Sequence, residues 1–144
     1  MTKHFTTPEF TDLLKQYGIE IATPFYRYFD IVSPTVDRIG IDCQYGMLDI
    51  NSRYIAEGQE VCEPKPAYLL SEVLTWLPEE ILNGYYLYGE VTNGIQFWGY
   101  ADDNHRGGLY WKIESKPIEQ LITQGLTEGW LTKEIIEQQI KDNQ

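Results

Sequence analysis

The chain has 144 residues, with 22 acidic and 11 basic side chains, so its net charge at pH 7 is -11. This acidic balance argues against binding to nucleic-acid phosphates, which requires a basic surface, and against anionic membranes. A hydrophobic content of 42% and an aromatic content of 14% indicate a globular chain and exclude a disordered one. At this length we expect a single domain over residues 1–144.

The composition also bears on the compartment. No apolar run approaches the ~18 residues of a membrane helix, and the start of the chain lacks the apolar segment of a signal peptide. We therefore expect a cytoplasmic protein. In that compartment Cys43 and Cys62 are expected as reduced thiols, with a disulfide between them as the alternative.

The first predicted element is a helix near the amino terminus. Thr6 or Thr7 can cap it, Pro8 suits its first turn and Gly18 is expected to end it. Its apolar residues follow the helical spacing i, i+3, i+4 and i+7: Phe10, Leu13, Leu14 and Tyr17. This stripe predicts a helix that packs on a core.

Residues 19–48 are expected to form short strands. Residues 25–32 are aromatic and strand-like up to Ser33-Pro34, residues 36–41 can return as a second strand, and residues 42–46 resemble a turn. We expect these strands to cover or extend a central sheet formed later in the chain.

The middle of the chain is predicted as a loop and then a helix. Residues 51–66 are polar and irregular, which favours a surface loop. A helix is expected from about Pro66 to Leu77, where Pro78 stops it or begins a new turn, and Glu79-Glu80 suits a further short turn.

The central element is expected to be a three-stranded meander. Residues 85–91, 95–102 and 109–114 alternate with period two and are rich in aromatic and β-branched side chains. Thr92-Asn93-Gly94 joins the first two strands, as a two-residue or a three-residue loop.

We choose the three-residue loop because only that register keeps one face apolar. It pairs Val91 with Ile95, and it pairs Gly89 with Phe97 and Leu87 with Gly99. The predicted core face then carries Tyr85, Leu87, Val91, Ile95, Phe97, Leu109, Trp111 and Ile113.

The opposite face of this register is unusually aromatic. It carries Glu90, Gln96, Lys112 and Glu114 together with five aromatic residues, Tyr86, Tyr88, Trp98, Tyr100 and Tyr110. Either the amino-terminal half of the chain covers this face or it is a contact surface. The five aromatic residues are therefore the candidate partner-binding residues.

Two helical segments are expected to end the chain. Apolar residues from Ile118 to Trp130 follow the helical period after Pro117, and Thr132 can cap a second segment that reaches Ile140. Gly125 and Gly129 either allow a close approach to the sheet or mark the end of the first helix.

No catalytic residue, cofactor or phosphate-binding loop is predicted. The chain has no zinc spacing and no glycine-rich phosphate motif. Asp102, Asp103 and His105 could ligate a metal ion in the loop 102–108, but a hairpin loop is the favoured interpretation of that composition.

The order of these motifs resembles a set of small uncharacterised proteins from phage and prophage regions of gut bacteria. The resemblance rests on the amino-terminal helix followed by Phe25–Phe29, on the Pro66 to Trp76 segment, on the hairpin, and on Glu119 through Leu126. Pro78 and the extension from Leu131 to Gln144 depart from that pattern. The resemblance implies no activity and no site.

Together these observations predict an α+β fold, with an antiparallel sheet, a central three-stranded meander and helices packed mainly on one face. The expected function is that of a non-enzymatic accessory protein of a phage or mobile element, acting through protein-protein contacts. The alternatives are a metal-dependent or hydrolytic enzyme using residues 102–108, and a self-associating structural protein. A protein partner or a second copy is expected, and neither nucleic acid nor membrane.

Overall fold

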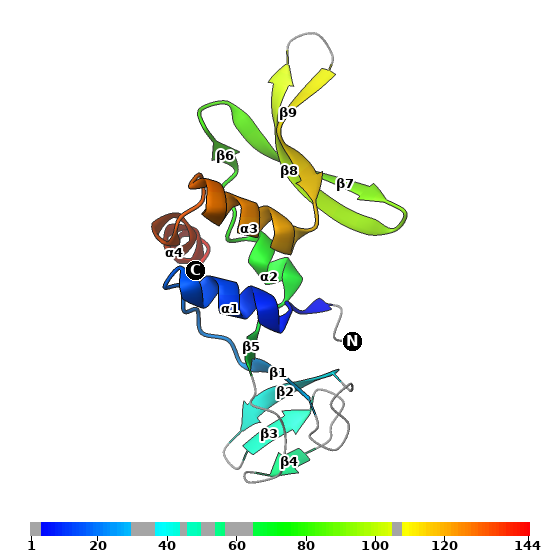
Figure 1. Cartoon of the computed structure of the whole chain (residues 1–144), viewed down its shortest axis with the longest axis vertical. Coiled ribbons are helices and arrows are strands. Elements are labelled where there is room, and N and C mark those ends of the chain that lie inside the picture. The colour runs from blue at the N-terminus through cyan, green and yellow to red at the C-terminus, as the bar shows by residue number, and fades with distance from the viewer. Residues whose placement is uncertain (1–3, 30–36, 44–45, 50–53, 57–64, 105–107) are drawn as a thin grey trace. The chain divides into compact units, whose positions relative to one another are not determined.

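The computed structural model describes residues 4–29, 37–43, 46–49, 54–56, 65–104 and 108–144. These residues form an α+β fold with helices and two antiparallel sheets, which confirms the predicted fold class. The chain divides into two compact units, Met1–Leu70 and Ser71–Gln144, and each is described by itself (Figure 1). The single domain expected from the sequence stays a prediction.

Helix α1, Pro8–Gln16, forms where the capping signals predict it. The Thr7 hydroxyl accepts a hydrogen bond from the Phe10 N–H at 3.3 Å. At the other end, the N–H groups of Gly18 and Ile19 donate to the carbonyls of Lys15 and Leu14 at 3.0 and 2.9 Å. These two bonds pair carbonyls that have no partner within the helix. Gly18 takes the left-handed conformation that this carboxy-terminal cap needs.

The first unit contains a five-stranded sheet in the order β4-β3-β2-β1-β5. Its strands are β1 (Phe25–Phe29), β2 (Asp37–Cys43), β3 (Gly46–Asp49), β4 (Tyr54–Ala56) and β5 (Lys65–Ala67). The strands predicted near residues 25–32 and 36–41 are therefore present, whereas β4 and β5 replace parts of the predicted loop 51–66. Cys62 and the centre of the predicted turn 42–46 lie outside the described residues.

The expectation that these strands extend the central sheet is wrong. Arg27 of β1 pairs with Ile39 of β2 on one side and with Lys65 of β5 on the other. Both edges of β1 are thus occupied within the first unit, which builds a sheet of its own. Backbone pairing between β1 and β5 joins residues about forty apart in the sequence, and no local sequence signal reports such a contact.

The core of the first unit lies where the amino-terminal segment meets this sheet. Phe5, Ile39 and Ala67 are buried together, and Phe25 packs against them with its ring edge-on to Phe5. The buried Arg27 guanidinium donates to the backbone carbonyls of Phe5 and Thr6. A buried cation that is held by carbonyl oxygens fixes the segment before α1 to the sheet.

Helix α2, Leu70–Leu74, is shorter than predicted. Pro66 was expected to open it, but Pro66 lies in β5 and pairs with Tyr26. Strand pairing therefore delays the helix, and Trp76 and Leu77 follow it as buried turn residues. The expected turn at Glu79-Glu80 is also wrong, because Glu80 begins strand β6, Glu80–Ile81.

The second unit contains a four-stranded antiparallel sheet in the order β6-β7-β8-β9 (Figure 1). The predicted meander is confirmed as β7 (Tyr85–Thr92), β8 (Ile95–Asn104) and β9 (Gly108–Lys116). Strand β6 adds to it by pairing with the start of β7.

The register of the β7–β8 hairpin differs from the prediction. Thr92 pairs with Ile95, so the loop has two residues, Asn93 and Gly94. Their φ angles are 51° and 77°. Positive φ at both central positions defines a turn whose twist matches that of the strands, and Asn-Gly is the sequence that adopts it most readily.

This one-residue change moves every side chain of β8 relative to β7. Leu87 pairs with Tyr100 and not with Gly99, and Glu90 pairs with Phe97. Leu87 and Phe97 therefore lie on opposite faces of the sheet, and the predicted core face is wrong.

Helices α3 (Ile118–Glu128) and α4 (Lys133–Asp142) complete the second unit. Gly129 has φ 85° and ends α3, and the Thr132 hydroxyl accepts a hydrogen bond from the Ile135 N–H at the start of α4. Helix α3 packs on β8 and β9. Within the described part of the chain, no helix has the length and apolar character needed to cross a membrane.

Candidate functional site: an aromatic face of the second sheet

One face of the β6–β9 sheet is part of the core, and we call it the inner face. Tyr100 on this face is 0% exposed, its hydroxyl donates to the Pro78 carbonyl at 2.7 Å, and its ring meets Trp130 edge-on at 5.2 Å. Ile113 pairs with Tyr100 and is also buried. Burial raises the pKa of the Tyr100 hydroxyl well above its usual value, because the phenolate would lose its hydration.

The inner face is the side on which α3 lies. Trp98 pairs with Lys116, and the Lys116 ammonium donates to the side chain of Gln124 on α3. The residues of β7 on this side are those that pair with Trp98 and Tyr100, which are Gly89 and Leu87. The opposite side of the sheet is therefore turned away from α3.

We call that opposite side the outer face, and define it by Tyr86, Tyr88, Phe97 and Trp111. Tyr86 pairs with Ala101, which in turn pairs with Trp111. Tyr86 is 50% exposed and Tyr88 is 39% exposed. The rings of Tyr88 and Trp111 meet edge-on, with centroids 5.1 Å apart, which is a favourable aromatic geometry.

Small residues in the middle strand make this ring contact possible. Tyr88 on β7 pairs with Gly99 on β8, and the next residue of β8 on the same face is Ala101. A Cβ added at Gly99 would lie 2.6 Å from the Ile113 carbonyl oxygen and 2.8 Å from the Ser115 nitrogen. Gly99 thus allows the irregular β8–β9 pairing and leaves space above β8 in which rings from β7 and β9 meet.

Carboxylates border the aromatic residues of the outer face. Glu80 pairs with Tyr86 and Glu90 pairs with Phe97, so both lie on this side of the sheet. The Glu90 carboxylate accepts a hydrogen bond from the Ser115 hydroxyl. Residues 71–144 contain twelve acidic and five basic side chains, a net charge of -7 with histidine neutral. The outer face therefore combines exposed aromatic rings with negative charge.

The structure separates the five aromatic residues predicted to bind a partner. Tyr86 and Tyr88 lie on the outer face, whereas Trp98 and Tyr100 lie on the inner face. Tyr110 is 63% exposed and pairs with Asp102, two positions along β8 from Tyr100.

The prediction that these five residues share a face is wrong, because the hairpin loop is one residue shorter than expected. Tyr100 is a core residue. Phe97 and Trp111 belong to the outer face and not to the predicted core face. The Asn93-Gly94 pair was the signal that could have identified them.

The loop 102–108 gives no assembled metal site. The Asp102 carboxylate accepts a hydrogen bond from the Tyr110 N–H at 3.2 Å, and Asp103 pairs with Leu109 in the hairpin. His105 lies outside the described residues. Among the residues that the structure describes, no three His, Cys, Asp or Glu side chains are grouped to hold a metal ion.

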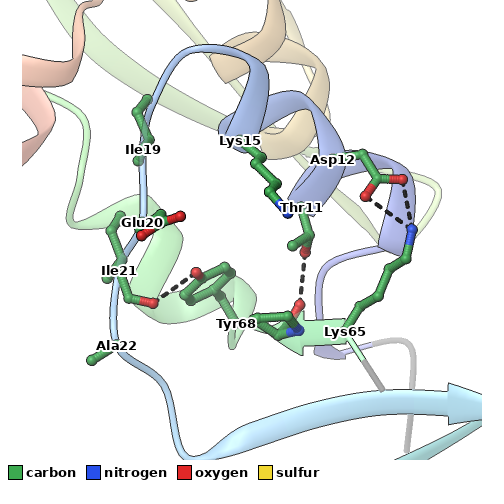
Figure 2. Close-up of a pocket in the computed structure, with 10 residues that line it drawn as sticks. Thr11, Asp12, Lys15, Ile19, Glu20, Ile21, Ala22, Lys65 and Tyr68 are labelled. Carbon is green, nitrogen blue, oxygen red and sulfur yellow. Dashed lines mark hydrogen bonds and ion pairs between the residues drawn. The ribbon is translucent and has the colours of Figure 1, made fainter. Parts of the chain in front are cut away.

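The first unit has a pocket of about 400 Å³ beside α1 (Figure 2). Its walls are α1 and residues 19–22, Tyr68 lies at its lower side in the view of Figure 2, and Pro66 also lines it. The Tyr68 hydroxyl donates to the Ile21 carbonyl at 2.8 Å, and the Thr11 hydroxyl donates to the Pro66 carbonyl at 2.7 Å. These bonds join the three parts of the pocket wall.

Comparison of the chain with models of protein families, with curated proteins and with solved structures finds no match.

Proposed function

We propose that this protein is a binding protein whose outer face captures a cationic segment of a protein partner. The observation that carries the proposal is the Tyr88–Trp111 ring pair beside the exposed Tyr86, on the same face as Glu80 and Glu90. Aromatic rings and carboxylates both attract arginine and lysine side chains, the rings through their negative faces.

The charge of this face selects among partners. Aromatic rings on a sheet can also stack on nucleic-acid bases, but those surfaces carry positive charge beside the rings to hold phosphates. Here the neighbouring side chains of Glu80 and Glu90 repel phosphate. They also disfavour a second copy of the same face, because two such faces would bring like charges together. A basic protein segment can place its cations over the rings and pair them with the carboxylates.

We further propose a non-enzymatic accessory role in a phage or mobile element. This part of the proposal rests on the motif order that resembles small phage and prophage proteins. It gives a biological setting for partner capture, and the partner itself is defined here only by its positive charge.

The direct test is titration with a short arginine-rich peptide, followed by tryptophan fluorescence and by calorimetry. We expect binding that weakens with added salt, since exposed charges are screened. Replacing Tyr88 by Ala removes a ring worth about 0.5–1 kcal/mol per exposed cation contact, so affinity should fall by about two- to fivefold. Glu90→Gln should also weaken binding of the peptide.

Tyr110→Ala is the matched control, because Tyr110 is exposed but lies outside the outer face. It should leave peptide affinity unchanged. Equal losses for Tyr88→Ala and Tyr110→Ala, or equally strong binding of a glutamate-rich peptide, would overturn the proposal. Sizing of the chain with and without peptide separates partner capture from self-association.

A further inference from the structure

We propose that the pocket beside α1 binds a small zwitterion, an amino acid with an apolar or aromatic side chain. The pocket lies wholly within residues 1–70 and shares no residue with the outer face. The proposal therefore does not depend on the function proposed above, and either one can fail without the other.

The charges in the pocket wall are distributed between two sides. Lys65 is already engaged, since its ammonium contacts both carboxylate oxygens of Asp12 at 2.8 and 2.9 Å. Lys15 extends from α1, and Glu20 lies on the facing 19–22 segment (Figure 2). In the part of the chain that the structure describes, neither the Lys15 ammonium nor the Glu20 carboxylate has an ion-pair or hydrogen-bond partner.

A ligand with both charges satisfies both of these groups. Its carboxylate would lie near Lys15 and its ammonium near Glu20. A simple anion such as phosphate would be attracted by Lys15 but repelled by the carboxylates of Glu20 and Asp12. A simple cation would be repelled by the two lysines. The four charged side chains sum to zero, which favours a net-neutral ligand.

The remaining surface of the pocket is suited to an apolar side chain. Ile19 and Tyr68 are buried residues with surface in the pocket wall, and Pro66 lies beside them. The bond from the Tyr68 hydroxyl to Ile21 fixes the orientation of the ring, so this surface is formed before a ligand arrives. A volume of about 400 Å³ is within the range of small-molecule sites and exceeds that of a single water molecule many times.

The test uses phenylalanine with two analogues that each lack one charge, 3-phenylpropionate and phenethylamine. Binding to the full chain is followed by amide chemical shifts of Thr11, Lys15 and residues 19–22. We expect phenylalanine to bind about two- to fivefold more tightly than either analogue, since each analogue lacks one of the two charge contacts and a contact between exposed charges is weak. Lys15→Gln should weaken phenylalanine and 3-phenylpropionate but not phenethylamine.

Glu20→Gln should have the reciprocal effect, weakening phenylalanine and phenethylamine but not 3-phenylpropionate. Lys141→Gln, an exposed lysine on α4, is the control and should change none of the three affinities. Amide shifts outside the pocket, equal binding of all three probes, or no binding of phenylalanine at millimolar concentration would each overturn the proposal. Affinity of the Tyr88→Ala variant for phenylalanine should equal that of the unchanged chain.

Discussion

Replacement of Tyr100 by Ala should destabilise the protein far more than replacement of Tyr88 by Ala. Tyr100 is 0% exposed, its ring contacts Trp130 and its hydroxyl binds the Pro78 carbonyl at 2.7 Å. Loss of a buried aromatic ring costs about 3–5 kcal/mol, and an unpaired buried carbonyl costs about 1 kcal/mol more. The sum is a large part of the total stability of about 5–15 kcal/mol that a domain has.

Tyr88 gives the contrast because it lies on the other face of the same sheet. The Tyr88 ring is partly exposed, so Tyr88→Ala removes mainly the ring contact with Trp111, which is worth about 0.5–1.5 kcal/mol. The predicted difference between the two variants is therefore about 3–5 kcal/mol. The register chosen from the sequence alone would place both rings on one face and predict similar effects.

The assay is urea unfolding followed by far-ultraviolet circular dichroism and by tryptophan fluorescence. A lower midpoint with an unchanged slope reports a change of stability without a change in the surface exposed on unfolding. Tyr100→Phe serves as a control that keeps the ring and removes only the hydrogen bond, so it should cost about 1 kcal/mol. Equal destabilisation by Tyr88→Ala and Tyr100→Ala would refute the assignment of the inner face.

Two further predictions concern the same sheet. Gly99→Ala should cost about 1–3 kcal/mol, because the added methyl group meets backbone atoms of β9. At Gly89 the three atoms nearest to an added methyl group belong to the Trp98 side chain, which can move, so Gly89→Ala should cost less in the same urea assay. A larger loss for Gly89→Ala would contradict this. Stability should also fall as pH rises above about 10, because the raised pKa of Tyr100 keeps its hydroxyl protonated in the folded state while the unfolded tyrosine ionises at its ordinary value. The contribution of the protonated Tyr100 hydroxyl to stability is complete below that pH and is lost above it. The melting temperature of Tyr100→Phe should therefore decline less steeply with rising alkaline pH than that of the unchanged protein. An identical decline would count against the buried hydroxyl.

Elements governed by local signals could be predicted from the sequence. Thr7 and Gly18 mark the two ends of α1, and Thr132 marks the start of α4, because caps act within a few residues of the backbone groups they satisfy. The three strands of the meander also follow from their own alternation and composition.

The register and the sheet of the first unit could not be predicted in the same way. An apolar face was favoured over the turn preference of Asn93-Gly94, yet aromatic residues occupy both faces of β7 and β8, so hydrophobicity alone does not choose between registers. The pairing of β1 with β5 is non-local, and the shortened α2 follows from it because Pro66 belongs to a strand.

The candidate site was half predicted for the same reason. Tyr86 and Tyr88 were predicted to share one aromatic face, and they do. They are two positions apart on β7, so they point to the same side of the sheet in either register of the hairpin. Phe97 and Trp111 were assigned to the core because their faces depend on pairing to β7 through the hairpin and through the irregular β8–β9 pairing near Gly99. The pocket beside α1 has no sequence signal, since its walls come from residues 11–22 and 65–68.

The most direct measurement is the set of cross-strand nuclear Overhauser effects in the β7–β8 hairpin. The two-residue turn predicts α-proton contacts between Leu87 and Tyr100 and between Gly89 and Trp98. Contacts of Leu87 with Gly99 and of Gly89 with Phe97 would instead establish a three-residue loop. In that case Tyr88 and Trp111 could not meet on one free face, and the proposed docking surface would be contradicted.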